Sequence, residues 1–464
     1  MRHAYIKIVG VSFFSAFVAT IALLTSSVMA DRITSPSYEI NGNLGGSFGG
    51  DTSSTSYKMT TIGGETVIGN GQSGSYIIDQ VQTNSSTGTM QLSIQPNGLV
   101  AYYPLDENTG TGTYDGSALQ NNGVLSGTAA WSATGKLGTA VNINGSTDST
   151  GTGAVLVPDS AALPSGSAMS FEGWVKQDAW YPNQAIASHW QYATSGSWAI
   201  QTGSDHNLRV YIAGTQTDTG VNYVETTVNT WNSFASWHHV AVLYDGTLSQ
   251  ANKVKIYVDG VLANSTVTGT LSSSLQNSSG SLSLGSFPGL GRALTGSLDH
   301  IKLFNRTLTM AEVIAEYNAQ NTGIPSGFTL GALSGSSVTS LGDAIVRTNA
   351  TNYSISAQQD HDLQAGSNTI PAIGGSITTP LTWSEGTTKG LGFTVTSAPI
   401  IDSKWGSGSK YAAFPLTTTA FYNGTGHVDG TVDTISMQTR LDVQSAQASG
   451  AYSNSVLYTG TTLP

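Results

Sequence analysis

The sequence WHHVAVLYDG, at residues 237–246, decides the fold of this chain, and the sequence KIYVDGVL at 255–262 follows it. In both stretches apolar residues recur at every second position, which is the spacing of a strand that buries one face. Both stretches then reach Asp-Gly, a dipeptide that tolerates the positive φ angles of a tight hairpin turn. We therefore expect two strands of a sandwich.

Two more segments extend this pattern, SFEGWVK at 170–176 and LTGSLDHIKLFNRTL at 294–308. In order and spacing, the four segments resemble the laminin-G-like (concanavalin A-like) jelly-roll family, and the resemblance covers residues 97–320. It implies an all-β fold, an antiparallel jelly-roll sandwich. It also implies recognition of an extracellular ligand, usually without catalysis.

One helix is predicted, at the end of this domain. Thr309 and Glu312 have the spacing of a capping box, in which each side chain bonds the backbone N–H of the other residue. One apolar face of the helix would consist of Met310, Val313, Ile314 and Tyr317. Jelly rolls of the family that the domain resembles also close with such a helix.

Residues 31–95 are predicted to form a small β-strand repeat module. Tyr38, Tyr57 and Tyr76 are nineteen residues apart, and alternating apolar residues follow each of them. Three short strands bury little apolar surface, so we expect the module to pack on its neighbour. The alternative is a Gly/Ser-rich spacer in which the repeat is a coincidence.

Residues 328–464 are predicted to form a C-terminal β-sandwich. Its pattern is again strand and turn, with one strand that places Ile435, Met437, Leu441 and Val443 on a single face. A turn at 444–450 followed by a strand at 451–460 would complete a final hairpin.

Residues 1–30 have the pattern of an export signal. Arg2 and Lys7 precede an apolar run at 8–24, and small residues lead up to Ala30. We predict cleavage after Ala30, with an uncleaved membrane anchor as the alternative. No second hydrophobic span follows, so no transmembrane domain is expected after cleavage. An exported chain without cysteine points to a bacterial protein that is secreted or displayed on the cell surface.

The composition limits the partners of this protein. Charged residues make up 10% of the chain, against about 25% in typical proteins. Loss of the signal removes two basic residues and no acidic one, so 15 basic and 28 acidic residues leave a net charge of −13. We therefore expect no nucleic-acid partner, because the sequence has no run of basic residues to contact phosphates. We expect an extracellular glycan or a surface protein instead.

The family resemblance implies a possible calcium site. In such jelly rolls an early Asp-containing segment and a closing strand approach each other at the rim and hold Ca²⁺, which needs six to eight oxygen ligands. Carried over to this chain, the ligands are Asp115, Asn122 and Asp299. His300 stands where the family usually has Glu. The alternative is that these residues cap turns and bind no metal.

Aromatic residues in polar, turn-like segments are the predicted ligand-binding residues. Trp180 and Tyr181 lie in one such segment, and Trp190 and Tyr192 lie in another. Exposed rings stack on the apolar faces of sugars, whereas buried rings fill the sandwich. Ordinary packing at the edge of the sandwich is the alternative for these four residues.

The sequence predicts no catalytic residue. Adjacent strand residues point to opposite faces, so His238 and His239 cannot enter one site by local geometry. No Gly-x-Ser-x-Gly elbow stands between a strand and a helix, although a Ser-His-Asp arrangement assembles in space and leaves no local pattern. The Glu-x-Asp-x-x-Glu pattern of glycanases on this fold is absent.

We therefore expect a non-catalytic adhesion or carbohydrate-recognition protein. The alternatives are a structural surface-layer or fibre protein and, third, a glycoside hydrolase on a concanavalin A-like fold.

Overall fold

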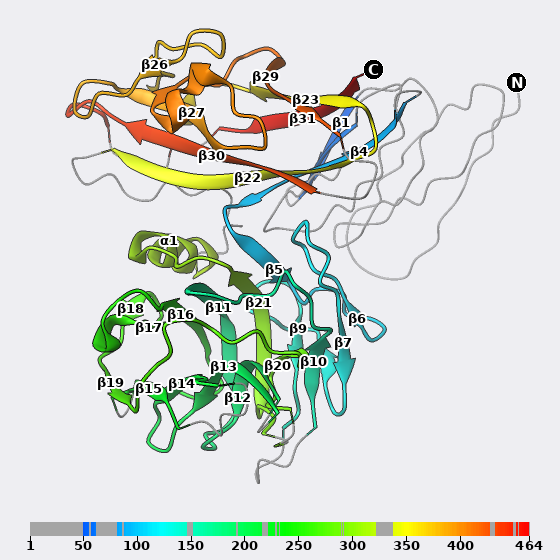
Figure 1. The fold of residues 1–464 in the computed structure, drawn as a ribbon, viewed down its shortest axis with the longest axis vertical. Helices are drawn as coiled ribbons and strands as arrows, with labels where there is room; N and C mark the ends of the chain where they lie inside the picture. The colour runs from blue at the N-terminus through cyan, green and yellow to red at the C-terminus, as the bar shows by residue number, and fades with distance from the viewer. Residues whose placement is uncertain are drawn as a thin grey trace, which may run out of the picture.

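The computed structural model describes residues 50–54, 57–61, 81–85, 88–145, 152–191, 194–215, 221–227, 230–231, 233–288, 290, 292–321, 337–426, 432–448, 452 and 454–463. Figure 1 shows a jelly roll and a second β-sandwich above it. The predicted signal at 1–30 lies outside the described residues, as do Tyr38 and Tyr76 of the predicted repeat. Tyr57 begins a strand, β2 (Tyr57–Thr61), which pairs with β1 (Gly50–Ser54).

The jelly roll consists of two antiparallel sheets. In the described part of the chain, the first sheet has nine strands in the order β19 (Ser265–Thr268), β15 (Tyr223–Thr226), β14 (Leu208–Ile212), β13 (Ser195–Thr202), β12 (Ala185–Gln191), β20 (Leu282–Leu284), β10 (Ala154–Val157), β7 (Gly123–Ser126) and β6 (Gly112–Thr113). The second has eight: β18 (Val261–Leu262), β17 (Val254–Val258), β16 (Trp237–Asp245), β11 (Ala168–Gln177), β21 (Gly296–Phe304), β9 (Ala140–Asn142) and β8 (Ala130–Ser132), with β5 (Leu99–Tyr103) also paired to β21.

The segments that predicted the fold are neighbours in the second sheet. Strands β17, β16, β11 and β21 lie side by side and are antiparallel. Alternate residues of β16, such as Val240 and Val242, point inward to the core between the two sheets. Their neighbours Ala241 and Leu243 belong to a second cluster, on the outer face. The predicted all-β, antiparallel jelly roll is therefore confirmed.

The two Asp-Gly dipeptides behave differently. Asp259 and Gly260 have φ angles of 51° and 74° and connect β17 to β18, which is the two-residue hairpin expected of Asp-Gly. Asp245 instead ends β16 before a longer loop that contains a short 3-10 helix (Gln250–Asn252). The Asp245 carboxylate accepts hydrogen bonds from the backbone and hydroxyl of Thr247, so it organises the start of that loop.

Helix α1 (Met310–Asn321) packs on the outer face of the second sheet. The capping box is present, because the Glu312 carboxylate accepts from Thr309 N at 2.7 Å and Thr309 Oγ1 accepts from Glu312 N at 3.2 Å. Val313 is buried against the sheet, whereas Met310, which the prediction placed on the same apolar face, is exposed. Among the described helices, none has the length and apolar character needed to cross a membrane.

The second sandwich also has two main sheets. Among the described residues they contain β27 (Gly390–Ser397), β30 (Val432–Asp442), β22 (Val338–Thr348), β4 (Gly88–Pro96) and β3 (Val81–Ser85), and β29 (Thr419–Thr425), β23 (Asn352–Gln359) and β31 (Val456–Leu463). Two small two-stranded sheets, β24 (Leu363–Ala365) with β25 (Asn368–Ile370) and β26 (Leu381–Thr382) with β28 (Lys410–Tyr411), and a 3-10 helix (Ser403–Gly408) complete it.

The strand predicted around residue 435 is confirmed, but the final hairpin is not. Ile435, Met437 and Leu441 of β30 share one buried face. However, β30 and β31 lie in different sheets, so the segment between them crosses the sandwich instead of turning back on itself. Such crossings are common in two-sheet sandwiches, where consecutive strands often belong to opposite layers.

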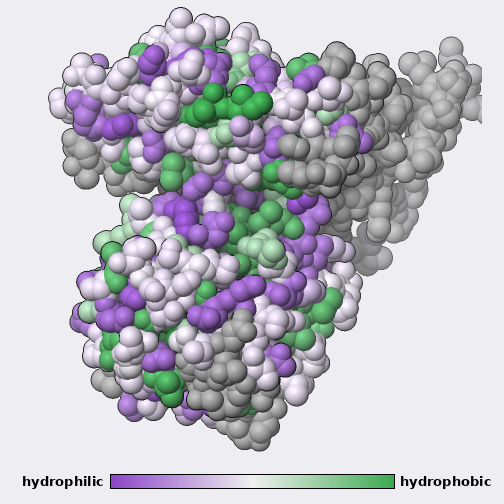
Figure 2. All heavy atoms as spheres, viewed as in Figure 1, coloured by the Kyte–Doolittle hydropathy of each residue, from purple (hydrophilic) through white to green (hydrophobic). Residues whose placement is uncertain are grey.

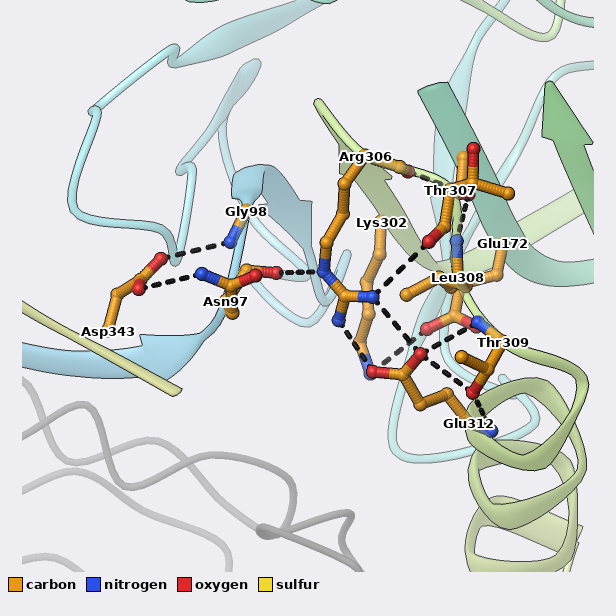
Figure 3. A network of polar contacts seen from close by, with 11 residues as sticks. Asn97, Gly98, Glu172, Lys302, Arg306, Thr307, Leu308, Thr309, Glu312 and Asp343 are labelled. Atoms are coloured by element: carbon orange, nitrogen blue, oxygen red, sulfur yellow. Dashed lines mark hydrogen bonds and ion pairs between the residues drawn. The ribbon is translucent and has the colours of Figure 1, made fainter. Parts of the chain in front are cut away.

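The second sandwich includes strands that precede the jelly roll in sequence. Strand β4 pairs with β22, and its residues Met90 and Leu92 belong to the core of this sandwich. The chain then passes into the jelly roll at Asn97 and Gly98. The side-chain amide of Asn97 and the backbone N–H of Gly98 each donate to the Asp343 carboxylate at 2.9 Å. Figure 3 shows this junction, where Arg306 also donates to the Asn97 carbonyl at 2.8 Å. The jelly roll is thus inserted into the second sandwich.

The visible surface agrees with the low charge of the sequence. Figure 2 shows a mostly pale surface of intermediate hydropathy, with hydrophilic and hydrophobic residues in small scattered groups. Gly, Ser and Thr residues, which have intermediate hydropathy and are abundant throughout the chain, account for this appearance.

Candidate functional site

Two of the three predicted calcium ligands are neighbours. Asp115 donates its backbone N–H to Asn122 Oδ1 at 2.9 Å. The Asp115 carboxylate accepts from the backbone N–H groups of Tyr102, Ser117 and Asn121, each at 2.8 Å. Burial raises the pKa of Asp115, although these hydrogen bonds oppose the rise. Asp115 therefore organises the turn that follows β6.

The third predicted ligand, Asp299, has a different set of partners. Its Oδ2 accepts from the backbone N–H groups of Lys136 and Leu137, at 2.7 and 2.9 Å. Its Oδ1 lies 2.8 Å from Nδ1 of His300. Neighbouring side chains of a regular strand point apart, but His300 has a φ of 50°, and this left-handed conformation lets the two groups meet.

A preformed calcium site does not fit these residues as they stand. The carboxylate oxygens of Asp115 and Asp299 already accept N–H groups, which Ca²⁺ would have to displace. Within the described residues, no three His, Cys, Asp or Glu side chains are grouped as metal ligands. Calcium binding stays a prediction.

The predicted ligand-binding residue Trp190 is buried. Its side chain is 1% exposed and packs against Tyr211 and Phe287 on the outer face of the first sheet. A shift of register between His189 and Trp190 accompanies this placement. The Trp190 ring is therefore not available to a sugar, which corrects the expectation drawn from its polar sequence neighbours. Tyr192 lies outside the described residues.

Trp180 belongs to a group of rings that is partly open to solvent. Its ring centroid lies 5.0 Å from that of His206 and 6.3 Å from that of Phe234, and His206 and Phe234 are 5.1 Å apart. Phe234 is 36% exposed, whereas Trp180 and its neighbour Tyr181 are half-buried. We call Trp180, His206 and Phe234 the aromatic corner.

The strand order explains why these rings meet. Trp180 lies between β11 and β12, His206 between β13 and β14, and Phe234 between β15 and β16. Strand β11 ends where its partner β16 begins, and β12, β13, β14 and β15 are antiparallel neighbours. All three connections therefore lie at the same end of the sandwich. Sequence reasoning missed His206 and Phe234. Their only signal was a place in polar loops, which many other residues share.

Beneath helix α1, the outer face of the second sheet buries charged side chains. Lys302 Nζ lies 3.8 Å from Glu172 Oε1 and forms an ion pair with Glu316 of the helix. Burial and the charge of Glu316 raise the pKa of Glu172 to about 8, against the effect of Lys302. Burial also lowers the pKa of His239 to about 4. We call Glu172, His239, Lys302 and Glu316 the sealed cluster.

The sealed cluster cannot meet a large ligand in this structure, because α1 covers it. The helix is fixed at its start by the Arg306–Glu312 ion pair, 2.6 Å between Nη2 and Oε1, which Figure 3 shows beside Lys302. Near its end, Trp174 donates its indole N–H to Gln320. The aromatic corner, unlike the sealed cluster, can contact an external molecule.

Comparisons with known proteins agree with this architecture. Residues 148–314 match a laminin-G family model described as the concanavalin A-like lectin/glucanases superfamily. A search of curated proteins found no match.

Among solved structures, the chain is similar to domain 4 of AbnA, an extracellular arabinanase from Geobacillus stearothermophilus solved with arabinotriose. The identity is 19% and the TM-score 0.36, over 47% of this chain and 98% of that one. It is also similar to the binding domain of Paraclostridial Mosquitocidal Protein 1, with 12% identity and a TM-score of 0.38 over 68% and 73% of the two chains.

A Trypanosoma rangeli sialidase is similar as well, with 13% identity and a TM-score of 0.36 over 49% of this chain and 34% of the sialidase. At such low identities these likenesses concern the fold. Together with the two antiparallel sheets, the family match over residues 148–314 shows that the central domain has the concanavalin A-like fold.

Proposed function

We propose that the jelly roll is the carbohydrate-recognition domain of a secreted or cell-surface bacterial protein, and that it binds a glycan at the aromatic corner. The observation that carries this proposal is the group of three clustered rings on loops at one end of the sandwich. A ring that reaches solvent can stack on the apolar face of a sugar, and its packed neighbours hold it in place.

The charge of the protein supports a neutral glycan as the ligand. Only 10% of the residues are charged, and the formal net charge is −11. Such a protein gains little binding free energy from contact with a polyanion, because both carry negative charge. Its hydroxyl-rich loops can instead form hydrogen bonds with sugar hydroxyls. We propose binding without cleavage of glycosidic bonds, because the sealed cluster holds its acidic groups away from any external ligand.

The test is glycan binding by the full chain and by Phe234→Ala. Phe234 is partly exposed, so its removal should weaken binding by about tenfold or more, the value of a lost stacking contact, with little effect on folding. The measurement is a glycan array followed by calorimetric titration with the best neutral glycan.

Tyr114→Ala is the matched control, because Tyr114 is 62% exposed and lies on a different loop of the same domain. It should bind as the wild type does. Equal binding by wild type and Phe234→Ala would contradict the proposed site. Polymer formation at micromolar concentration, with no glycan bound, would support the structural alternative instead. Titration with Ca²⁺ after chelation tests the calcium prediction, and heat from that titration would support it.

A further inference from the structure

Next to the aromatic corner, three side chains form a chain of hydrogen bonds. Ser233 Oγ lies 2.8 Å from Nε2 of His238, and Nδ1 of His238 lies 2.7 Å from Oδ2 of Asp259. This is the connectivity of a nucleophile, a general base and the carboxylate that orients the base. We propose that Ser233, His238 and Asp259 form an acyl-transfer site that hydrolyses small acyl esters on the bound carbohydrate.

Secondary structure brings the three residues together. Asp259 occupies the first position of the β17–β18 hairpin turn, and its other oxygen accepts from the backbone N–H of His239 at 2.9 Å. This second bond fixes the carboxylate toward β16. His238 lies two residues before Val240, on the inward face, where the sandwich ends and the side chain reaches the rim.

The orientation of the imidazole suits a general base. The Asp259 carboxylate can only accept a hydrogen bond, so Nδ1 of His238 carries a proton. Nε2 is then free of a proton and can accept that of the Ser233 hydroxyl. The Trp231 ring packs on the imidazole at 4.9 Å. Burial alone would lower the pKa of His238, but the hydrogen bond and charge of Asp259 outweigh it and raise the pKa.

The site is reachable from solvent and holds unused N–H donors. The His238 side chain is 12% exposed, the Asp259 side chain is 34% exposed, and Ser233 is half-buried. In the part of the chain that the structure describes, neither the Ser233 nor the Phe234 backbone N–H has a hydrogen-bond acceptor. An N–H directly after a nucleophile is a common donor to the oxyanion of acyl transfer.

Backbone strain also gathers here. Ala235 has a φ of 57°, a conformation that side chains other than Gly rarely adopt, and its N–H donates to the Gln177 carbonyl at 2.7 Å. His206 of the aromatic corner and Asp259 of the hairpin turn also have positive φ angles, of 54° and 51°. Such strain persists where surrounding contacts enforce it, and it is concentrated at functional sites.

The proposed reaction consumes water and produces an alcohol and a carboxylic acid. Ser233 Oγ attacks the ester carbonyl carbon while its proton passes to His238 Nε2. The bond to the sugar oxygen then breaks, and that oxygen takes the proton from Nε2, leaving acyl-Ser233. Water attacks the acyl carbon, its proton passes through Nε2 to Ser233 Oγ, and the acid leaves. The Ser233 carbonyl, 3.2 Å from Nε2, helps to hold the protonated imidazole.

The carbohydrate part of the substrate rests on the proposed function, whereas the ester chemistry does not. The experiment therefore uses p-nitrophenyl acetate and the full chain. We expect Ser233→Ala to lower kcat/KM by about 100-fold or more, and Asp259→Asn, which keeps a residue suited to the turn, by about tenfold or more. Ser236→Ala, an exposed serine three residues away, should match the wild type.

A second measurement does not depend on turnover. A fluorophosphonate probe should label Ser233, as found by mass spectrometry of the digested protein, and His238→Gln should prevent the labelling. A wild-type rate in Ser233→Ala, or a chain that the probe does not label at Ser233, would overturn the proposal.

The two proposals fail separately. Glycan binding that is sensitive to Phe234→Ala, without ester hydrolysis, would leave recognition standing and remove the acyl-transfer site. Ester hydrolysis without glycan binding would do the reverse.

Discussion

The sealed cluster and the Ser233–His238–Asp259 group beside the aromatic corner each contain a histidine from β16, but the two environments are opposite. His239 packs against Trp174 and Tyr317 beneath α1. His238, the preceding residue, is paired with Asp259 at the rim. Because successive strand residues point to opposite faces of a sheet, His239 joins a buried polar network whereas His238 joins an accessible one. The same side-chain types thus stabilise structure in one place and can meet a ligand in the other.

The largest expected effect is the removal of the charge that balances the sealed cluster. Lys302→Ala should destabilise the protein by about 3–5 kcal/mol, because it leaves the Glu316 carboxylate beneath the helix without its cation. Chemical denaturation of the full chain measures this. Lys176→Ala, which loses a partly exposed pair with Asp178 and a distant contact with the Trp237 ring, should cost less than about 1 kcal/mol. Similar losses for both variants would mean that the cluster is not sealed.

The two histidines should respond to pH with opposite signs. The pKa of His239 is lowered to about 4, so between pH 4 and 6.5 the unfolded chain binds more protons and stability rises with pH, by about 3 kcal/mol in all. His239→Phe should remove that rise. The pKa of His238 is raised, so its contribution is complete below pH 6.5 and is lost as pH increases beyond it.

His238→Gln should therefore differ most from the wild type below pH 6.5 and least in alkaline solution. Urea unfolding at a series of pH values, with both variants in parallel, gives the comparison. Curves that shift in the same direction for the two variants would show that the histidines share one environment.

Glu172 should give the sealed cluster a second dependence on pH, opposite in sign to that of His239. Its folded pKa of about 8 lies above the unfolded value of 4.5, so the folded chain holds the extra proton and stability falls as pH rises between these values. From pH 6.5 to 8 the fall should be about 2 kcal/mol. Glu172→Gln keeps the size of the side chain without its titration and should flatten this part of the curve. An unchanged slope would place the titration elsewhere.

The smallest expected effect concerns the start of the covering helix. Thr309→Ala removes the side-chain acceptor of the capping box and should cost about 1 kcal/mol. Thr309→Ser retains the hydroxyl and should restore most of that loss, as measured by thermal or chemical unfolding. Because Trp180, His206 and Phe234 lie on loops and not on α1 or the strands, neither variant should affect glycan binding at the aromatic corner.

The alternation of apolar residues was sufficient to predict the jelly roll. Val240 and Val242 face the core as a period of two requires, and the Thr309–Glu312 capping box was visible as a spacing. The sequence could not reveal which sheet a strand joins. Strand β4 pairs with β22, far along the chain, and the segment after β30 crosses to the other sheet, so neither feature has a local pattern.

Site residues were harder to predict because their roles depend on distant groups. Asp115 resembles a calcium ligand in sequence, yet backbone N–H groups of Tyr102 and Asn121 occupy its oxygens. Trp190 has polar neighbours in sequence, but Phe287 covers it from another loop. His238 and Asp259 stand 21 positions apart, and only the pairing of β16 with β17 brings them together.

The insertion of the jelly roll between β4 and β22 imposes an order of assembly. Gly98 and Asp343 bond across a separation of 245 residues, and closing a disordered loop of that size costs about 5 kcal/mol in chain entropy. Once the jelly roll has folded, the backbone of Asn305 bonds that of Gly98 at 2.9 Å, which brings the chain after β21 back to the start of the insertion. A nascent chain therefore emerges with β4 lacking its partner β22, matures its middle first, and completes the outer sandwich last.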